Sequence, residues 1–435
     1  MFSILRNRDF GLLWLAGLVS YAGDFALIVA LPLHVYSLTG SATATAAAFA
    51  ASFLPGVLFG SIAGVFVDRW DRKRTMVVTH LLRAIILLPL LLAPNSLGLL
   101  YAVAAAQGAI GLFFSPAESA LLPTLVGKDR LVAANAMNAL NDNFGRLIGP
   151  AVGALLYSRT GIAGVALVDA ATYVGSALLI GLIATDARPA RDEDTVIDGS
   201  PLKRMVSDWR AGLRVVRDDR SLSVLFATSS LGKVAEGVFL TLGLAPLVLD
   251  VLGGTPAQVG WLGTAQAVGG LIAGVSLVRI GQRLTMRWLV GGGLVGLGLA
   301  DFAAFNAHRL AAPGTPAVAV AMGWMGLAGF PVVAGGAGRQ ALVQTQAPDA
   351  YRGRVFGALS AVRGVAMLIG LGVGGVLGDA IGIVPVLSAS AVLRALAGVL
   401  TLTLLPRNES TPGGSDPLAR EAPTVGPTEA AKRKG

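Results

Sequence analysis

Three ionisable side chains stand in the middle of long apolar runs. Asp24 is followed by no Asp, Glu, Lys or Arg until Asp68, and Lys233 and Glu236 are three residues apart in another run. If these runs cross a bilayer, a charge at the centre costs about 2.5–3.5 kcal/mol and calls for a role. Lys233 and Glu236 can neutralise each other at helical spacing. Asp24 has no basic residue within a turn, so either its partner comes from another helix or its carboxyl is protonated.

Arginines form a second group, in the half of each apolar run that is expected to face the cytoplasm: Arg83, Arg146, Arg363 and Arg394. Arginine can extend from such positions to lipid headgroups, so anchoring is a structural alternative to a functional role. Asp142 could also neutralise Arg146, four residues away. Asp169 and Asp301 lie nearer the opposite ends of their runs and are interpreted as structural.

Two functions could use such charges. A carboxylate that binds and releases a proton as its surroundings change meets the requirement of proton coupling, and a charge in a water-filled cavity can bind a solute. The candidates for these roles are Asp24, Glu236, Lys233, Arg146 and Arg363. The three histidines lack metal-ligand spacing and no nucleotide-binding loop occurs, so we expect no metal, no cofactor, no ATP-driven pump and no enzyme.

The composition predicts that these charges are carried by membrane-spanning helices. Of 435 residues, 54% are hydrophobic and 14% are charged, with a mean hydropathy of +0.70, whereas soluble domains carry about 25% charged residues. The apolar runs reach the roughly 20 residues that cross a bilayer as a helix, and they are too long for barrel strands. The first run, 10–33, is too long for a signal peptide and is interpreted as a retained span.

Breaks between the apolar runs predict twelve spans. They lie near residues 10–36, 44–67, 75–93, 97–121, 138–157, 162–184, 221–249, 257–280, 286–306, 315–338, 355–378 and 382–406. With both termini in the cytoplasm, most of the 34 Lys and Arg residues fall in cytoplasmic segments, and the external loops hold only Arg159 and Arg309. This asymmetry follows the positive-inside rule and indicates a multi-pass protein of the inner (plasma) membrane. The net charge of +9 is attributed to this topology and to anionic lipid rather than to a nucleic-acid partner.

The breaks also predict the domain organisation. Residues 1–184 and 221–406 would form two pseudo-symmetric six-helix bundles, joined by a cytoplasmic linker at 185–220. The second half of the linker has the apolar spacing of an amphipathic helix, which could lie on the inner leaflet. The tail, 407–435, is rich in Pro, Glu, Thr and Gly and is expected to be disordered.

An internal repeat links the two halves. Gly60-x-x-x-Gly64 in the second span corresponds to Gly270-x-x-x-Gly274 in the eighth, and Pro32 of the first span corresponds to Pro246 of the seventh. Parallel six-span repeats are a design in which two bundles rock around a site at the membrane midplane. The repeat therefore indicates a transporter.

Residues 64–76 read GVFVDRWDRKRTM, a segment that resembles the signature between spans 2 and 3 of the major facilitator superfamily. The stretches SYAGDFALIVALPL, RLIGPAVGALLY and APDAYRGRVFG are similar to the subgroup of the enterobactin exporter and the macrolide-efflux proteins. The resemblance implies twelve helices in two bundles and a gating role for five residues of the signature: Gly64, Asp68, Arg69, Arg72 and Lys73. A plain positive-inside loop would account for the basic residues, but not for Gly64 and Asp68.

A second motif, Gly149-Pro150-x-x-Gly153, resembles the span 5 motif of antiporters and exporters. Proline removes a helix hydrogen bond and glycine admits a close neighbour, so a generic kinked helix is the structural alternative. One departure from the family is at Ala104, where many proton antiporters carry an arginine three residues before Gln107.

The sequence thus favours a monomeric secondary transporter that exports a small amphiphilic or drug-like molecule in exchange for protons. Import of a polar metabolite is an alternative, although spans rich in Ala, Leu, Gly and Val offer few hydrogen bonds to such a solute. A lipid flippase or a membrane scaffold is a further alternative.

Overall fold

The structure is a computed structural model, and it describes residues 2–67, 69–185, 201–281 and 284–406. Within these ranges the chain is helical and contains no strand. The first half contains η1 (Phe2–Arg6), α1 (Arg8–Thr39), α2 (Ala42–Val67), α3 (Arg72–Leu87), α4 (Pro89–Leu92), α5 (Leu97–Gly111), α6 (Phe114–Val126), η2 (Lys128–Arg130) and α7 (Leu131–Gly181). The second half contains α8 (Pro201–Asp218), α9 (Arg220–Leu242), η3 (Leu247–Val251), α10 (Pro256–Ile280), η5 (Trp288–Gly292), α11 (Gly293–Phe305), α12 (Ala307–Leu310), α13 (Ala317–Gln346), η6 (Asp349–Tyr351), α14 (Arg352–Ile381) and α15 (Ile383–Leu404).

Side-chain caps and one glycine set several helix ends. The side chain of Asn7 accepts a hydrogen bond from the Phe10 amide at the start of α1, and Asp71 accepts one from the Arg74 amide at the start of α3. Such caps satisfy amides that the first helical turn leaves free. Gly40 ends α1 with φ 60°, a left-handed conformation that glycine adopts without a steric penalty. These local signals separate the apolar runs into helices.

Eleven helical segments among the described residues are long and apolar enough to cross a membrane. The sequence predicts twelve spans, and the difference lies in α7, a 51-residue segment that contains both expected spans, 138–157 and 162–184, with a kink between them. A helix of that length extends about 75 Å, more than twice the roughly 30 Å of a bilayer core. Gly161, near its middle, has φ 66° and interrupts the helical geometry. The chain is a multi-pass helical membrane protein.

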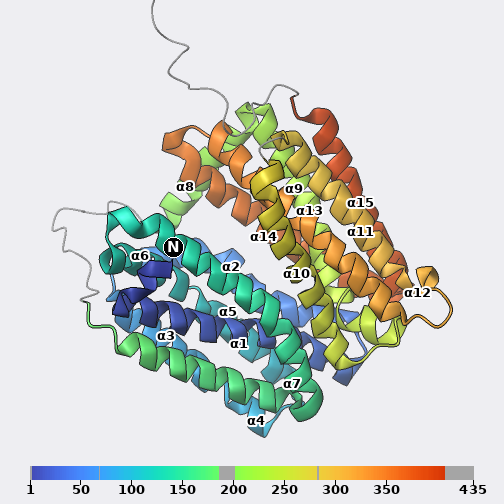
Figure 1. The fold of residues 1–435 in the computed structure, drawn as a ribbon, viewed down its shortest axis with the longest axis horizontal. Coiled ribbons are helices and arrows are strands. Elements are labelled where there is room, and N and C mark those ends of the chain that lie inside the picture. The colour runs from blue at the N-terminus through green and yellow to red at the C-terminus, as the bar shows by residue number, and fades with distance from the viewer. Residues whose placement is uncertain (1, 68, 186–200, 282–283, 407–435) are drawn as a thin grey trace, which may run out of the picture.

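The two halves of the chain occupy different regions of the molecule (Figure 1). Within the first half α1 packs along α7, and within the second half α9 packs along α14. Across the interface between the halves, α7 contacts α10 and α2 contacts α14. Helices from both halves therefore surround the centre of the molecule.

The linker helix α8 is attached to the second half. Asp208 Oδ1 accepts a hydrogen bond from Arg354 Nε at 2.9 Å, and Val216 is buried in a cluster with residues of α9, α13 and α14. Gly212 lies against the backbone carbonyl of Arg354, where a larger residue would collide. The helix packs on protein along this face, while Trp209 remains exposed.

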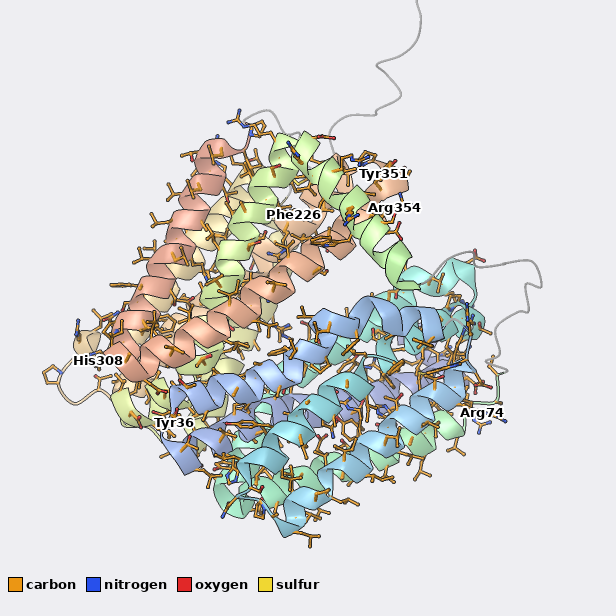
Figure 2. The ribbon with its side chains drawn as sticks, turned by 180° about the vertical axis from the view of Figure 1, so that it is seen from behind. Tyr36, Arg74, Phe226, His308, Tyr351 and Arg354 are labelled. Carbon is orange, nitrogen blue, oxygen red and sulfur yellow. The ribbon has the colours of Figure 1, made fainter. Side chains whose placement is uncertain are left out.

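The halves are joined most closely at the end that carries the loop between α1 and α2. Figure 2 shows their ribbons meeting near Tyr36 and lying farther apart toward Arg354. At the joined end the Asp379 carboxylate, on α14, accepts hydrogen bonds from Ser41 Oγ (2.8 Å), the Ala42 amide (2.7 Å) and the Thr43 amide (3.0 Å). The N-terminus of α2 in one half is thus capped by a side chain of the other half.

Candidate functional site

A cavity of about 740 Å³ lies between the two halves. Its first-half wall is largely aromatic and aliphatic, with Phe25 and Ile28 of α1 and Phe49 and Phe53 of α2. Its second-half wall continues into a charged pocket of about 240 Å³. The cavity and the pocket share the side chains of Arg146, Lys233, Glu236 and Gln266. The site therefore combines an apolar surface of the first half with a charged pocket that comes mainly from the second half, and to which the first half adds Arg146.

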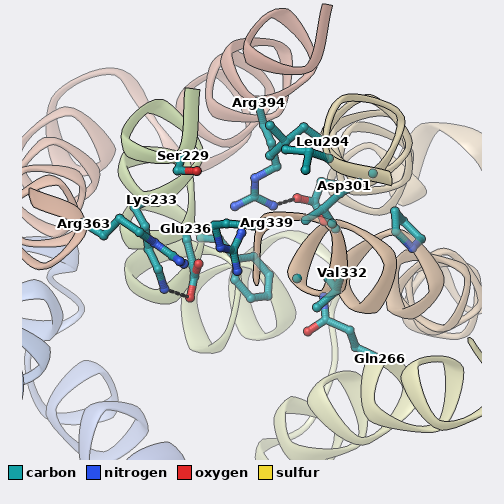
Figure 3. Close-up of a pocket in the computed structure, with 18 of the residues that line it drawn as sticks. Ser229, Lys233, Glu236, Gln266, Leu294, Asp301, Val332, Arg339, Arg363 and Arg394 are labelled. Carbon is teal, nitrogen blue, oxygen red and sulfur yellow. Dashed lines mark hydrogen bonds and ion pairs between the residues drawn. The ribbon is translucent and has the colours of Figure 1, made fainter. Parts of the chain in front are cut away.

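The charged side chains of this pocket come from six helices, and Figure 3 shows most of them. It is lined by Arg146 of α7, Lys233 and Glu236 of α9, Asp301 of α11, Arg339 of α13, Arg363 of α14 and Arg394 of α15. Lys233 Nζ donates to Glu236 Oε1 at 2.6 Å, and Arg394 forms a buried ion pair with Asp301. Four of the five residues that the sequence singled out for coupling or substrate binding thus share one pocket.

Three residues that line the pocket are not among the candidates that the sequence suggests for coupling or substrate binding. The expected span 315–338 ends just before Arg339, but α13 continues to Gln346 and Arg339 lines the pocket. The sequence favours a structural role for Asp301 and leaves anchoring as one alternative for Arg394; in the structure the two residues pair with each other and line the pocket. Since Asp301 and Arg394 are 93 residues apart, sequence spacing gives no sign of their contact.

The fifth candidate, Asp24, lies in a separate polar cluster within the first half. Arg83 Nη2 on α3 donates to Asp24 Oδ1 at 2.7 Å, and the Tyr173 hydroxyl of α7 donates to the same oxygen. Arg83 Nε also donates to Gln107 Oε1 at 2.7 Å. The partner of Asp24 is therefore an arginine of another helix, one of the two alternatives that the sequence leaves open. Although Ala104 replaces the arginine expected on α5, a guanidinium from α3 still lies beside Gln107.

A second carboxylate belongs to the Asp24 cluster. Asp169 is 1% exposed. Its Oδ1 lies against Gly23 and accepts a hydrogen bond from Thr172 Oγ1 at 3.1 Å. Its Oδ2 is buried without a hydrogen-bond partner among the described residues. Asp169 was interpreted as structural from its position in the sequence. In the structure, the carboxyl groups of Asp24 and Asp169 and the guanidinium of Arg83 lie in the same interior region.

The Asp24 cluster is adjacent to the central cavity. A pocket of about 180 Å³ is lined by Asp24, Arg83 and Gln107. Ile28 and Phe53 form part of the wall of both this pocket and the central cavity. The two spaces are therefore neighbours across these side chains.

Of the signature residues, Asp68 lies outside the described residues. Lys73 Nζ donates to the Ile183 carbonyl at 2.6 Å and thereby binds the C-terminal end of α7, a favourable place for a cation. Arg69 is exposed, Arg72 is half-buried, and the position of Gly64 has open space around it. The observed Lys73 contact stays within the first half, and the gating role of the signature remains a prediction.

The second motif lies at close contacts between helices. A side chain at Gly149 would collide with Phe25 and Ala22 of α1, and one at Gly153 would collide with Ala26. Gly260 of α10 lies against the Pro150 carbonyl, across the interface between the halves. The motif therefore allows α7 to pack against α1 and α10 at once.

Comparison with known proteins identifies the family. The model of the family described as transmembrane secretion effector matches residues 1–424. The chain belongs to this family of major facilitator transporters. Its members are transporters and not enzymes, and the resemblance seen in the sequence is confirmed.

Relatives of this family cover nearly the whole chain. The multidrug efflux pump Tap of Mycolicibacterium fortuitum is 27% identical over 91% of this chain and 95% of its own. The macrolide efflux protein A of Streptococcus pyogenes is 26% identical over 85% of this chain and 89% of its own. The enterobactin exporter EntS of Escherichia coli O6:K15:H31 is 26% identical over 93% of each chain.

Solved structures share the fold. A bacterial homologue of the iron transporter ferroportin, in an inward-facing state, superposes with a TM-score of 0.70 at 18% identity, over 91% of this chain and 98% of the other. The nucleoside transporter NupG gives a TM-score of 0.71 at 12% identity, over 91% and 98%. At these identities the likeness shows the fold alone.

Proposed function

We propose that this transporter exports a small amphiphilic molecule by alternating access, in exchange for protons. The observation that carries the proposal is the cavity between the halves, which has apolar side chains along the first half and opens into a charged pocket formed mainly by the second half. Rocking of the two halves around such a site would expose it to each side of the membrane in turn. The efflux functions named for the relatives support export.

The topology proposed with this function has twelve spans, in two six-helix bundles, with both termini in the cytoplasm. The break at Gly161 supports a division of α7 into two spans. The loop between α1 and α2 and the C-terminal end of α14 would then be external, and α8 would be cytoplasmic. The halves would be closed on the external side by Asp379 and its hydrogen bonds to α2.

Reporter fusions test this topology. A reporter that is active only in the periplasm should be active when it follows Gly161 and inactive when it follows Asp219. A reporter that is active only in the cytoplasm should give the reverse pattern, since an odd number of crossings separates the two positions. The same activity at both positions would show that α7 crosses the membrane differently and would contradict the twelve-span arrangement.

Proton coupling is assigned to Asp24, with Glu236 as the second candidate. Asp24 forms an ion pair with Arg83 and has a second carboxyl group, that of Asp169, nearby. The negative charge of Asp24 can therefore be neutralised either by Arg83 or by a bound proton. The pocket beside Asp24 shares Ile28 and Phe53 with the central cavity, so Asp24 lies close to the space in which a substrate would bind. Glu236 is held by Lys233 and faces the cavity directly.

The direct test of export uses cells that lack their own efflux pumps. Expression of the chain should lower the accumulation of at least one compound in a panel containing erythromycin, enterobactin, ethidium and acidic dyes, because outward transport opposes entry. A proton uncoupler should restore accumulation to the level of cells with an empty vector. Unchanged accumulation of every compound, with the protein present in the membrane, would contradict export; resistance to the uncoupler would contradict proton coupling.

A further inference from the structure

The charged pocket holds more positive than negative side chains. Its ionisable residues are Arg146, Lys233, Arg339, Arg363, Arg394, Glu236 and Asp301. Glu236 pairs with Lys233 and Asp301 pairs with Arg394. The guanidinium groups of Arg146, Arg339 and Arg363 have no ion pair among the residues that the structure describes. The pocket therefore carries a surplus of three positive charges.

These three arginines come from three helices and face one space. Arg339 and Arg363 are half-buried, and Arg363 Nε has no hydrogen-bond partner in the described chain. Figure 3 shows both guanidinium groups directed toward the space beside Lys233 and Glu236. Removing unpaired charges from water is unfavourable, so their retention in a cavity suggests that a ligand supplies the missing charge.

We propose that the exported molecule is an amphiphilic anion with a carboxylate or similar acidic group. The acidic group binds Arg339 and Arg363, and Arg146 of the first half adds to the positive potential. The planar guanidinium forks of arginine match a carboxylate in a bidentate geometry. This inference rests on the proposed export function and names its substrate class.

The apolar wall opposite the arginines fits the rest of such a molecule. Phe25, Phe49 and Phe53 of the first half line the central cavity, and aromatic side chains bury large apolar areas. One ligand would thus contact the second half through its charge and the first half through its apolar body. Binding would couple the positions of the two halves, as alternating access requires.

The test measures binding of 1-pyrenebutanoate and its neutral methyl ester to the purified full-length protein in phosphatidylcholine nanodiscs. Both probes are fluorescent and share one apolar body, so their comparison isolates the carboxylate. Partition of each probe into lipid is common to all variants and is subtracted with empty nanodiscs. The wild-type protein should bind the carboxylate at least about tenfold more tightly than the ester, because charge-assisted hydrogen bonds are available only to the acid.

The variants Arg339→Gln and Arg363→Gln should each weaken carboxylate binding about tenfold or more and leave ester binding unchanged. Lysine at either position should restore part of the affinity because it keeps the charge without the fork. Arg309→Gln, at an exposed position outside the pocket, is the matched control and should bind as the wild type does. Melting temperatures identify any variant that fails to fold. If a glutamine variant does not fold, the lysine variant at the same position is compared with the wild type instead.

Equal affinity for acid and ester, or equal losses of both in the glutamine variants, would overturn the anion site. Phosphatidylglycerol added to the nanodiscs tests a lipid headgroup as the source of the acidic group. The proposal expects weak competition, whereas complete displacement of the probe would overturn it in favour of lipid. Because binding is measured without transport, the outcome is separate from that of the export assay: a neutral compound could be exported without this site, and an anion could bind without being exported.

Discussion

Asp24→Asn is expected to reduce proton-driven export to background and to leave substrate binding measurable. Asparagine keeps the shape of the side chain and can still accept a hydrogen bond from Tyr173, but it cannot exchange a proton. Asp24→Glu keeps a titratable group and should retain part of the activity. The measurement is efflux from everted membrane vesicles under an imposed proton gradient, with substrate binding to the purified protein in parallel.

The ion pair with Arg83 requires a control for stability. Loss of one partner leaves the other charge in the interior, and breaking a buried pair costs about 3–5 kcal/mol. Asp24→Asn should therefore lower the melting temperature, and the double variant Asp24→Asn/Arg83→Gln, which removes both charges, should recover much of it. We expect the double variant to fold and to remain uncoupled.

Two results would contradict the role of Asp24. Wild-type proton-driven efflux by a well-expressed Asp24→Asn protein would exclude it as the coupling residue and make Glu236 the leading candidate. Recovery of proton-driven export in the double variant would show that Asp24 acts only by neutralising Arg83. Asp169→Asn is informative in either case, because Asp169 is the second carboxyl group of this cluster.

The sequence could predict the helices and the isolated charges because both are local properties. Long apolar runs are required of any chain that crosses a bilayer by helices, and a charge inside one is visible at once. The sequence predicts a break between residues 157 and 162, and the structure has its non-helical residue, Gly161, within that break. A positive φ at a single glycine has no signature in the sequence other than the glycine itself.

The pairing of charges could not be predicted because it depends on how helices pack. Asp24 and Arg83 are 59 residues apart, and two helices bring them into contact. Arg339 is a second example. It stands at the end of an apolar run, where the positive-inside rule predicts a loop. In the structure α13 continues past it, and Arg339 lines the pocket. The surplus of positive charge in the pocket follows from these contacts.

The contact between the halves at Asp379 makes the central claim testable. Opening this end requires the carboxylate to leave Ser41 and the amides of Ala42 and Thr43. Next to this contact, a β-carbon placed at Gly378 would lie 3.2 Å from that of Ala42 in the other half. Disulfides join β-carbons about 3.5–4.5 Å apart, so a small adjustment would let two cysteines bridge the halves here. The chain has no cysteine of its own, so an introduced pair has no competing thiol.

Export by the Ala42→Cys/Gly378→Cys variant, measured before oxidation, after oxidation and after reduction, tests alternating access most directly. The cysteine-free parent and each single-cysteine variant, treated in the same way, are the controls. Because the bridge holds one end of the molecule closed, export should fall to background in proportion to the cross-linked fraction, return on reduction, and stay constant in the controls. Undiminished export by fully cross-linked protein would contradict the account, since the two halves could then not separate at this end during transport.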